Sequence, residues 1–135
     1  MSTTDDTYLV AIRPLDFFRA SEEVDRARVV ALAESIRAAG CWCVPLPVER
    51  DTGLVMDGNH RLRVAHRLGL KRLPCVPLSY ADPRVDVRGW RCGQPFDRTL
   101  LRRLARTGGL LPPKTTRHRF APALPVTEIP LALLL

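Results

Sequence analysis

The sequence predicts a single small α/β domain, because short apolar runs alternate with helical patterns along its 135 residues. A chain of this length fits one domain and buries roughly two-thirds of the surface that its unfolded form exposes, which is enough for a core. Hydrophobic residues make up 46% of the chain and charged residues 26%, an ordinary globular balance. We expect one domain over residues 1–135, with its core at about 8–121 and an extended tail or final strand at 122–135.

The first half of the chain predicts two strands and one helix. An apolar run over Tyr8–Ile12, ending at Pro14, indicates a strand, and an acidic loop follows over 17–23. Asp25 is a good N-cap for a helix over 26–39, and Gly40 ends it. Residues with helical spacing indicate the buried face of this helix: Val29, Leu32, Ala33 and Ile36. Trp42–Val48 is expected to be a strand whose two prolines place it at an edge or a bulge.

The second half continues the alternation. A turn at 51–53 leads to a short apolar strand, Leu54–Met56, which runs directly into a helix over about 59–68 that Gly69 closes. A strand is expected over 73–78, and a further one over 85–90 within a loop-rich region. Asp97 caps a third helix over 98–107, and Gly108-Gly109 stops it. Two prolines then precede a basic cluster at 114–118.

The net charge of +7 favours anionic partners such as nucleotides, phosphorylated metabolites or nucleic acid. It does not choose between them, and much of the arginine lies on predicted helices, where a solvated basic face is an equally good interpretation.

Several classes of protein are disfavoured by the sequence. Met1–Thr7 is polar and acidic and does not resemble a secretory signal, and no apolar run is long enough to span a membrane, so we expect a cytoplasmic protein. The four cysteines are therefore expected to be reduced. Cys41 and Cys43 lack the usual zinc spacing and no Cys-x-x-Cys pair occurs, which disfavours a Cys/His metal site.

The Asp57–Arg61 turn is the strongest candidate site. A strand that opens directly into a helix presents unpaired amides and a positive dipole end to an anion, and Gly58 lets a ligand approach the backbone. His60 and Arg61 add side-chain donors for phosphate oxygens. Asp57 would repel a phosphate by itself, which indicates a metal ion or a hydroxyl proton nearby. The alternative is a plain turn with Asp57 as N-cap and His60 and Arg61 solvated.

A wider set of residues carries a family resemblance. Glu34-Ser35-Ile36, Pro45–Val48, Val55–Arg61 and Leu73–Pro77 follow one another in an order that resembles the ParB/sulfiredoxin-like nucleotide-binding fold. That fold implies a small mixed sheet flanked by about three helices. Within it, the chain is most similar to the free L-serine kinases, whose motif is Asp-Gly-x-His-Arg, with Asn59 here at the variable position.

This resemblance implies a set of roles. It places Glu22 and Asp57 at catalytic positions, with Gly58, Asn59, His60 and Arg61 at the nucleotide phosphates. Trp90 falls where the family lines its serine pocket, and the stretch resembling the family's substrate segment contains Thr115, Thr116, Arg117 and His118. The implied reaction makes O-phospho-L-serine from free L-serine, with Mg²⁺ near Asp57 and ATP or ADP as donor. The alternatives are a solvated Glu22, a core Trp90 and a strand at 115–118 with an exposed basic side.

The sequence bears on three other functions. A sulfiredoxin-type reductase needs a cysteine in the turn, where this chain has Asn59. A ParB-type regulator adds a helix-turn-helix domain, for which we expect no room after residue 121; nucleic-acid binding is possible but not favoured, and a ParB-like nuclease function would rest on fold analogy alone. A nucleotide- or heme-responsive binding module without catalysis stays open.

Overall fold

The computed structural model describes residues 7–135, so the expectation about a secretory signal falls almost wholly outside the described residues. The helices and strands run in this order: β1 (Ala11–Pro14), α1 (Arg26–Ala39), β2 (Cys41–Trp42), β3 (Leu46–Glu49), α2 (Asn59–Arg67), β4 (Arg72–Leu78), β5 (Val85–Gly89), α3 (Arg98–Thr107), β6 (Thr116–Phe120) and β7 (Ile129–Pro130). Two 3₁₀ turns, η1 (Leu15–Phe17) and η2 (Leu131–Leu134), complete the list. The predicted α/β class, with a small mixed sheet and three helices, is confirmed within this range.

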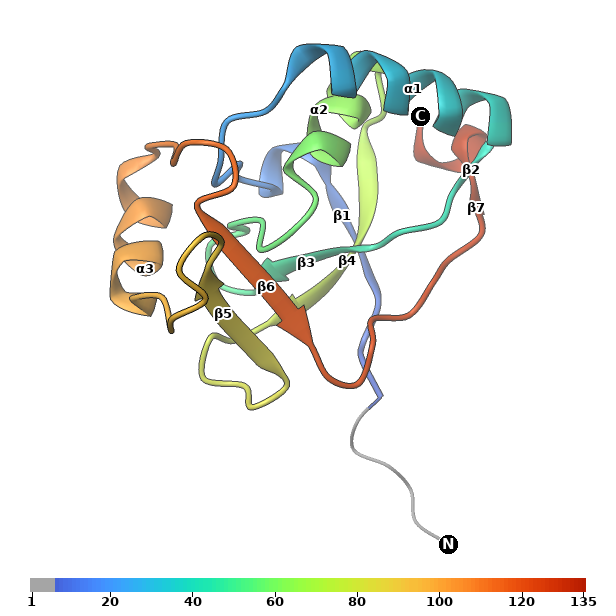
Figure 1. Cartoon of the computed structure of the whole chain (residues 1–135). Coiled ribbons are helices and arrows are strands. Elements are labelled where there is room, and N and C mark those ends of the chain that lie inside the picture. The colour runs from blue at the N-terminus through green and yellow to red at the C-terminus, as the bar shows by residue number, and fades with distance from the viewer. Residues whose placement is uncertain (1–6) are drawn as a thin grey trace, which may run out of the picture.

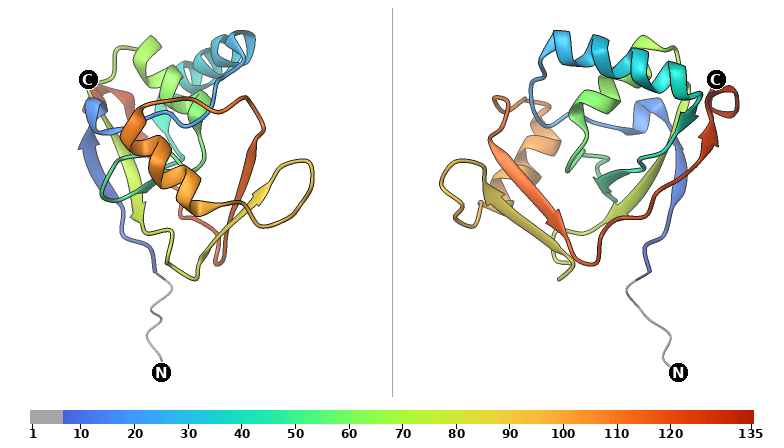
Figure 2. Two further views of the ribbon diagram at one scale, coloured as in Figure 1. Left: turned by 90° about the vertical axis from the view of Figure 1, so that its left-hand side faces the viewer. Right: turned by 45° about the vertical axis from the view of Figure 1, so that its right-hand side comes forward.

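Among residues 7–135, the strands form three small sheets (Figure 1). The central sheet has the order β1-β4-β3, with β1 antiparallel and β3 parallel to β4. Two-stranded ribbons form from β2 with β7 and from β5 with β6, both antiparallel. The helices α1 and α2 lie side by side at one end of the molecule, whereas α3 lies beside the β5–β6 ribbon (Figures 1 and 2).

Local signals determine the two longer helices. The Asp25 carboxylate accepts a hydrogen bond of 2.9 Å from the Ala27 amide at the start of α1, and Gly40 ends the helix with φ 73°. Asp97 caps α3 in the same way through the Thr99 amide. Both helices have the bounds that these capping residues predict, and Val29 and Ala33 form the buried face of α1.

Three strand predictions need correction. Trp42–Val48 is not one strand, because β2 pairs with β7 while β3 pairs with β4, and residues 43–45 between them have no regular structure. Leu54–Met56 is buried but makes only isolated bridges, to Arg19 and Val48, instead of a regular strand. The first strand lies later than predicted, at Ala11–Pro14, where Ala11 pairs with Cys75 and Pro14 with Arg72 of β4.

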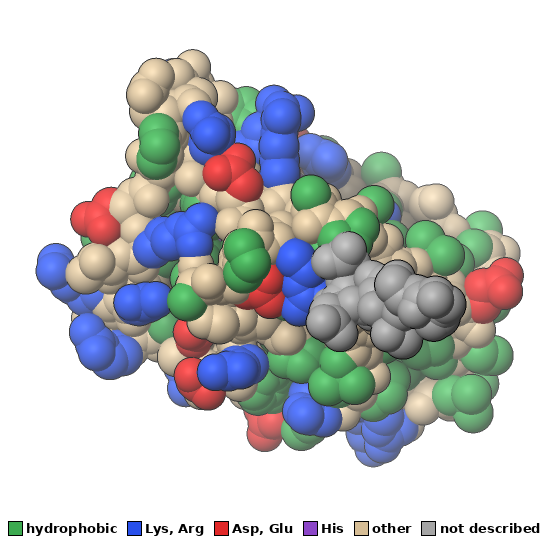
Figure 3. Space-filling model, turned by 90° about the horizontal axis from the view of Figure 1, so that it is seen from below, with side chains coloured by type: hydrophobic (Ala, Val, Ile, Leu, Met, Phe, Trp, Pro, Cys, Tyr) green, Lys and Arg blue, Asp and Glu red, His purple; other side chains and the backbone are tan. Residues whose placement is uncertain are grey.

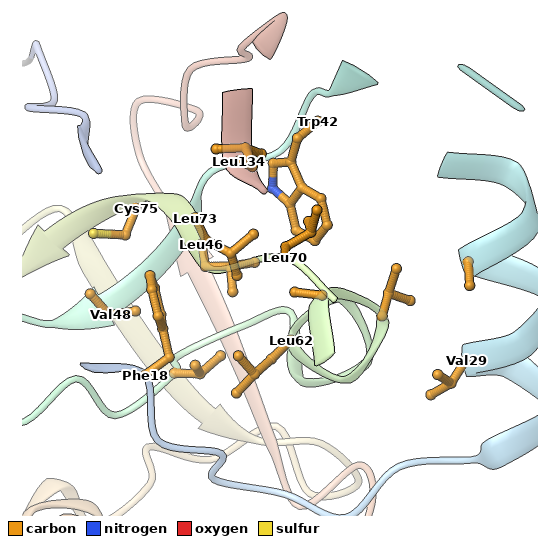
Figure 4. Close-up of a cluster of buried hydrophobic side chains, with 14 residues drawn as sticks. Phe18, Val29, Trp42, Leu46, Val48, Leu62, Leu70, Leu73, Cys75 and Leu134 are labelled. Atoms are coloured by element: carbon orange, nitrogen blue, oxygen red, sulfur yellow. The ribbon is translucent and has the colours of Figure 1, made fainter. Parts of the chain in front are cut away.

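Two hydrophobic clusters form the interior. The first joins α1 and α2 to the central sheet and includes Trp42, Leu46, Leu62 and Leu134 (Figure 4). The second joins α3 and the β5–β6 ribbon to the buried side chains of Leu54, Met56 and Tyr80. Residues of the predicted tail therefore contribute to the first core, since Leu134 is buried and its carbonyl accepts from the Lys71 amide. Within residues 7–135, no helix has the length and apolar character needed to cross a bilayer.

Candidate functional site

One cavity of about 740 Å³ opens where the start of α2, the loop before α1 and the start of β6 meet. Its walls include both predicted catalytic carboxylates, the whole Asp57–Arg61 turn and most of the predicted substrate segment. The residues that line it are Glu22, Glu23, Asp25, Arg28, Ala31, Leu32, Met56, Asp57, Gly58, Asn59, His60, Arg61, Trp90, Pro113, Lys114, Thr116, Arg117 and His118. Segments far apart in the sequence thus share one site.

The floor of the cavity is the N-terminus of α2. Gly58 caps this helix with φ 100°, and a Cβ built there would lie 2.7 Å from the buried Leu46 side chain, so the position requires glycine. The first intrahelical hydrogen bond runs from the Leu62 amide to the Gly58 carbonyl at 2.9 Å. The amides of residues 59–61 precede it and have no helical partner, which makes this end of the helix able to receive an anion.

The Asn59 side chain points into the protein. Its Oδ1 accepts a hydrogen bond of 2.8 Å from the Ser21 amide, and its Nδ2 donates to the Ser21 hydroxyl at 3.1 Å. That hydroxyl donates in turn to the Val55 carbonyl at 2.6 Å. Asn59 and Ser21 are the buried polar residues among those described, and each satisfies the other. Any contribution of Asn59 to an anion would therefore come from its backbone amide.

The Glu22 carboxylate ties the loop before α1 to the loop before β6. Its Oε1 accepts from the Lys114 amide at 3.1 Å, and its Oε2 accepts from the Thr116 amide at 3.0 Å and the Thr116 hydroxyl at 2.7 Å. A backbone bond of 2.9 Å from the Leu111 amide to the Ser21 carbonyl runs beside this contact. Lys114 itself has φ 57°, an uncommon conformation for a residue with a side chain, and the bond to Glu22 stabilises it.

His60 links the starts of the two neighbouring helices. Its Nε2 accepts a hydrogen bond of 3.1 Å from the Asp25 amide, so the ring is neutral there and its proton is on Nδ1. Burial, reinforced by the positive charge of Arg28, lowers the pKa of His60 below its usual 6.5, while Asp25 and Glu22 oppose the shift. The cavity therefore faces a neutral imidazole with one free donor.

Two cationic side chains lie over the indole of Trp90 at the rim of the cavity. The Arg117 guanidinium lies 5.2 Å and the Lys114 ammonium 5.8 Å from the ring centroid, both within cation–π range. Trp90 is 42% exposed, so it is not a core residue, and its amide donates to the Thr115 carbonyl at 3.0 Å. An aromatic face with two adjacent cations suits a small anionic ligand.

Thr115 is separate from the other predicted residues. It does not line the cavity, and its hydroxyl donates to the Pro112 carbonyl at 2.6 Å, which holds the turn before β6. Sequence reasoning missed Arg28, which lines the cavity from the first turn of α1, and Ser21, which orders Asn59. The position of Arg28 just after a helix cap was an available signal for an anion site, whereas nothing near Ser21 in the sequence indicated its partner.

Asp57 faces the cavity with an exposed side chain and has no ion-pair partner among residues 7–135. The same part of the chain holds no cluster of three or more acidic, histidine or cysteine side chains that would bind a metal without help from a ligand. A cation at Asp57 would thus need a ligand's oxygens to complete its coordination.

The amino-acid sequence is similar to those of proteins named L-serine kinases. It is 34% identical over 73 residues, 51% of its own length, to an ATP-dependent L-serine kinase of Staphylothermus marinus. It is 31% identical over 80 residues, 56% of its length, to the ADP-dependent L-serine kinase SerK of Thermococcus kodakarensis. These matches cover 29% and 33% of the relatives, so the chain spans about a third of the curated proteins it matches. No family model matches.

Solved structures give a longer match. A free serine kinase with one glutamate replaced by glutamine, in complex with AMP, superposes with a TM-score of 0.84 at 15% identity, covering 93% of this chain and 94% of that one. SbnI from Staphylococcus aureus, truncated at its C-terminus, superposes with a TM-score of 0.74 at 15% identity, covering 93% and 88%. The chain therefore has the fold of the free serine kinase structure, which is the fold that the sequence resemblance implied.

Proposed function

We propose that this chain transfers a phosphoryl group from a nucleotide to the hydroxyl of free L-serine, giving O-phospho-L-serine. The observation that carries the proposal is the shared cavity, in which Glu22, the start of α2 and the start of β6 meet. Curated relatives named L-serine kinases and a matching fold that binds AMP support it. Phosphoryl transfer depends mainly on positioning and charge neutralisation, which such a cavity can supply.

Glu22 would accept the proton of the serine hydroxyl as that oxygen attacks the terminal phosphorus of the nucleotide. A carboxylate offers about four lone-pair sites, and three of those on Glu22 already accept hydrogen bonds. The remaining site is on Oε1, which accepts only from the Lys114 amide. The three bonds would hold this oxygen in a fixed orientation for the serine hydroxyl.

The amides at the start of α2, with Arg61, would hold the nucleotide phosphates. Four acidic and four Lys or Arg side chains line the cavity, so its own charge is nearly balanced: Glu22, Glu23, Asp25 and Asp57 against Arg28, Arg61, Lys114 and Arg117. A polyphosphate entering a balanced cavity brings uncompensated negative charge. Mg²⁺ held by Asp57 and phosphate oxygens fits this need, since Mg²⁺ typically takes one or two carboxylates together with substrate phosphates.

The serine would lie toward β6, between Glu22 and Trp90. Arg117 is exposed at this rim and suits the serine carboxylate, because a guanidinium can bind a carboxylate through two parallel bonds. Thr116 and His118 line the same wall. The Trp90 indole would close the side of this pocket.

The direct test is to incubate the chain with L-serine, Mg²⁺ and either ATP or ADP and to measure phosphoserine by mass spectrometry. We expect turnover with one donor and a loss of roughly 100-fold or more in rate for Glu22→Gln, with nucleotide affinity little changed. Glu34→Gln is the matched control, because Glu34 lies on α1 outside the cavity and pairs with Arg37 at 3.3 Å. No phosphoserine with either donor would refute the proposal.

A nucleotide-binding module without catalysis is the second candidate. It is favoured by the three hydrogen bonds at Glu22, which a purely structural tie between two loops would also explain. Such a module would bind nucleotide without forming phosphoserine, and Glu22→Gln would then lower stability instead of rate. Figure 3 shows no separate basic patch on the face that it draws, where Lys and Arg side chains are dispersed among Asp and Glu side chains.

A further inference from the structure

The buried Tyr80 and the partly buried His118 form a pair at the wall of the cavity. The Tyr80 hydroxyl oxygen lies 3.0 Å from His118 Nε2, and the two rings are 5.8 Å apart. Tyr80 follows β4 and is only 1% exposed, whereas His118 lies on β6 and stacks on Phe120 at 6.4 Å. The other ring nitrogen, His118 Nδ1, is buried and has no hydrogen-bond partner among the described residues.

Counting protons decides which way the hydrogen bond runs. If His118 Nε2 donated to Tyr80, the buried phenol proton would have no acceptor and Nδ1 would be a buried acceptor without a donor. If Tyr80 donates to Nε2, the proton of the ring lies on Nδ1 and only this one group is left without a partner. Each buried polar group without a partner costs about 1–3 kcal/mol, so the second arrangement is favoured.

Burial is the main reason that both groups stay neutral. Burial, and then the positive charge of Arg98 on α3, lower the pKa of His118 to about 4, with Asp86 on β5 opposing them. Burial raises the pKa of Tyr80. The Arg98 guanidinium is fixed beside this pair, because it donates to the carbonyls of Tyr80 and Val85. At neutral pH the pair is therefore a phenol bonded to an uncharged imidazole.

We propose that Tyr80 is a positioning residue that fixes His118 in its Nδ1–H tautomer, so that the imidazole offers a hydrogen-bond donor and not a base to the cavity. A buried N–H without a partner is completed by an oxygen acceptor, and the carboxylate or phosphoryl oxygens of a ligand have that chemistry. The identity of this ligand as serine or phosphoserine rests on the proposed function, but the tautomer does not.

The experiment is a long-range ¹H–¹⁵N NMR correlation on the labelled chain at pH 7. The sequence holds three histidines, and His118→Gln identifies the resonances of interest by their loss. We expect His118 Nδ1 to resonate as a protonated nitrogen and Nε2 as an unprotonated one. A wild-type spectrum with the proton on Nε2 would overturn the proposal without any variant at Tyr80.

Tyr80→Phe removes only the hydroxyl and is expected to shift the proton toward Nε2. Tyr8→Phe is the matched control. Tyr8 is the other tyrosine of the chain, and this substitution removes a hydroxyl that donates to the Pro122 carbonyl at 2.6 Å, away from the cavity. An unchanged tautomer in Tyr80→Phe would also overturn the proposal. If the chain forms phosphoserine, Tyr80→Phe should lower kcat/KM roughly tenfold, as for one lost hydrogen bond. Absence of turnover would refute the kinase and leave the NMR result standing.

Discussion

The Glu22 carboxylate accepts a hydrogen bond of 2.7 Å from the Thr116 hydroxyl, although 94 positions separate the two residues in the sequence. The same oxygen accepts from the Thr116 amide at 3.0 Å, so one residue of β6 holds Glu22 through both its backbone and its side chain. Because the hydroxyl can be removed without touching the amide, its contribution can be measured separately.

Thr116→Val is expected to lower phosphoserine formation roughly tenfold, because Glu22 keeps two of its three donors but loses its shortest hydrogen bond. Thr52→Val provides the control, since the Thr52 hydroxyl donates to a different glutamate, Glu49, at the same 2.7 Å and lies outside the cavity. Both variants should lose a similar amount of stability. Equal rates for the two variants in a phosphoserine assay would show that the Thr116 hydroxyl does not position Glu22.

Gly58→Ala is expected to lower the free energy of unfolding by about 2–4 kcal/mol, measured by urea denaturation. The variant combines an unfavourable φ of 100° with a Cβ only 2.7 Å from the fully buried Leu46 side chain. Gly40→Ala separates the two effects, because φ is 73° there and nothing lies within 4 Å of the added atom. Gly40→Ala should lower the free energy of unfolding by about 1 kcal/mol. A loss equal to that of Gly58→Ala would contradict the predicted clash with Leu46.

Stability should fall as the pH is lowered from 6.5 toward 4, partly because of His118. Its folded pKa of about 4 lies below the ordinary 6.5, so the unfolded chain binds this proton first and acid favours unfolding. The contribution of His118 to the free energy of unfolding is fully present above pH 6.5. It amounts to roughly 3 kcal/mol and is lost as the pH falls to about 4. His118→Gln should flatten the pH dependence of the unfolding free energy over this range, measured by urea denaturation at several pH values, and an unchanged dependence would contradict the assignment to His118.

Trp90 should report on ligand binding through its fluorescence. The chain has two tryptophans, and Trp42 is only 1% exposed while Trp90 is 42% exposed between two cations. Iodide should therefore quench Trp90 selectively, and a nucleotide with serine should protect it. The Trp90→Phe variant should lose both responses, whereas quenching that persists in that variant would assign the accessible emission to Trp42.

The parts of the fold that the sequence predicted well are those with local causes. Helix α1 has its cap at Asp25 and its stop at Gly40 within the same segment, so its bounds could be determined without knowledge of the rest of the chain. The Asp57–Arg61 turn was recognised for the same reason, since its glycine and helix start are adjacent. The strands were harder, because β2 is defined by β7, whose residues lie near the other end of the chain.

The candidate site shows the same division. Family resemblance identified Glu22 and the segment near Thr116, but their hydrogen bonds arise only from the folded arrangement of the two loops. The inward orientation of Asn59 was not predictable, because its partner Ser21 lies 38 positions away. Likewise, no feature of the sequence around Tyr80 indicated that its hydroxyl would meet His118.

The cavity has walls from both hydrophobic clusters, since α1 and α2 pack on the first and the β5–β6 ribbon packs on the second. A small rotation of one cluster against the other would change the width of the cavity while leaving the packing inside each cluster intact. Leu101→Ala, which changes a buried residue of α3 that does not line the cavity, would then alter the width of the cavity as well as folding. The shape of the cavity therefore depends on the packing of the interior as well as on the residues that line its walls.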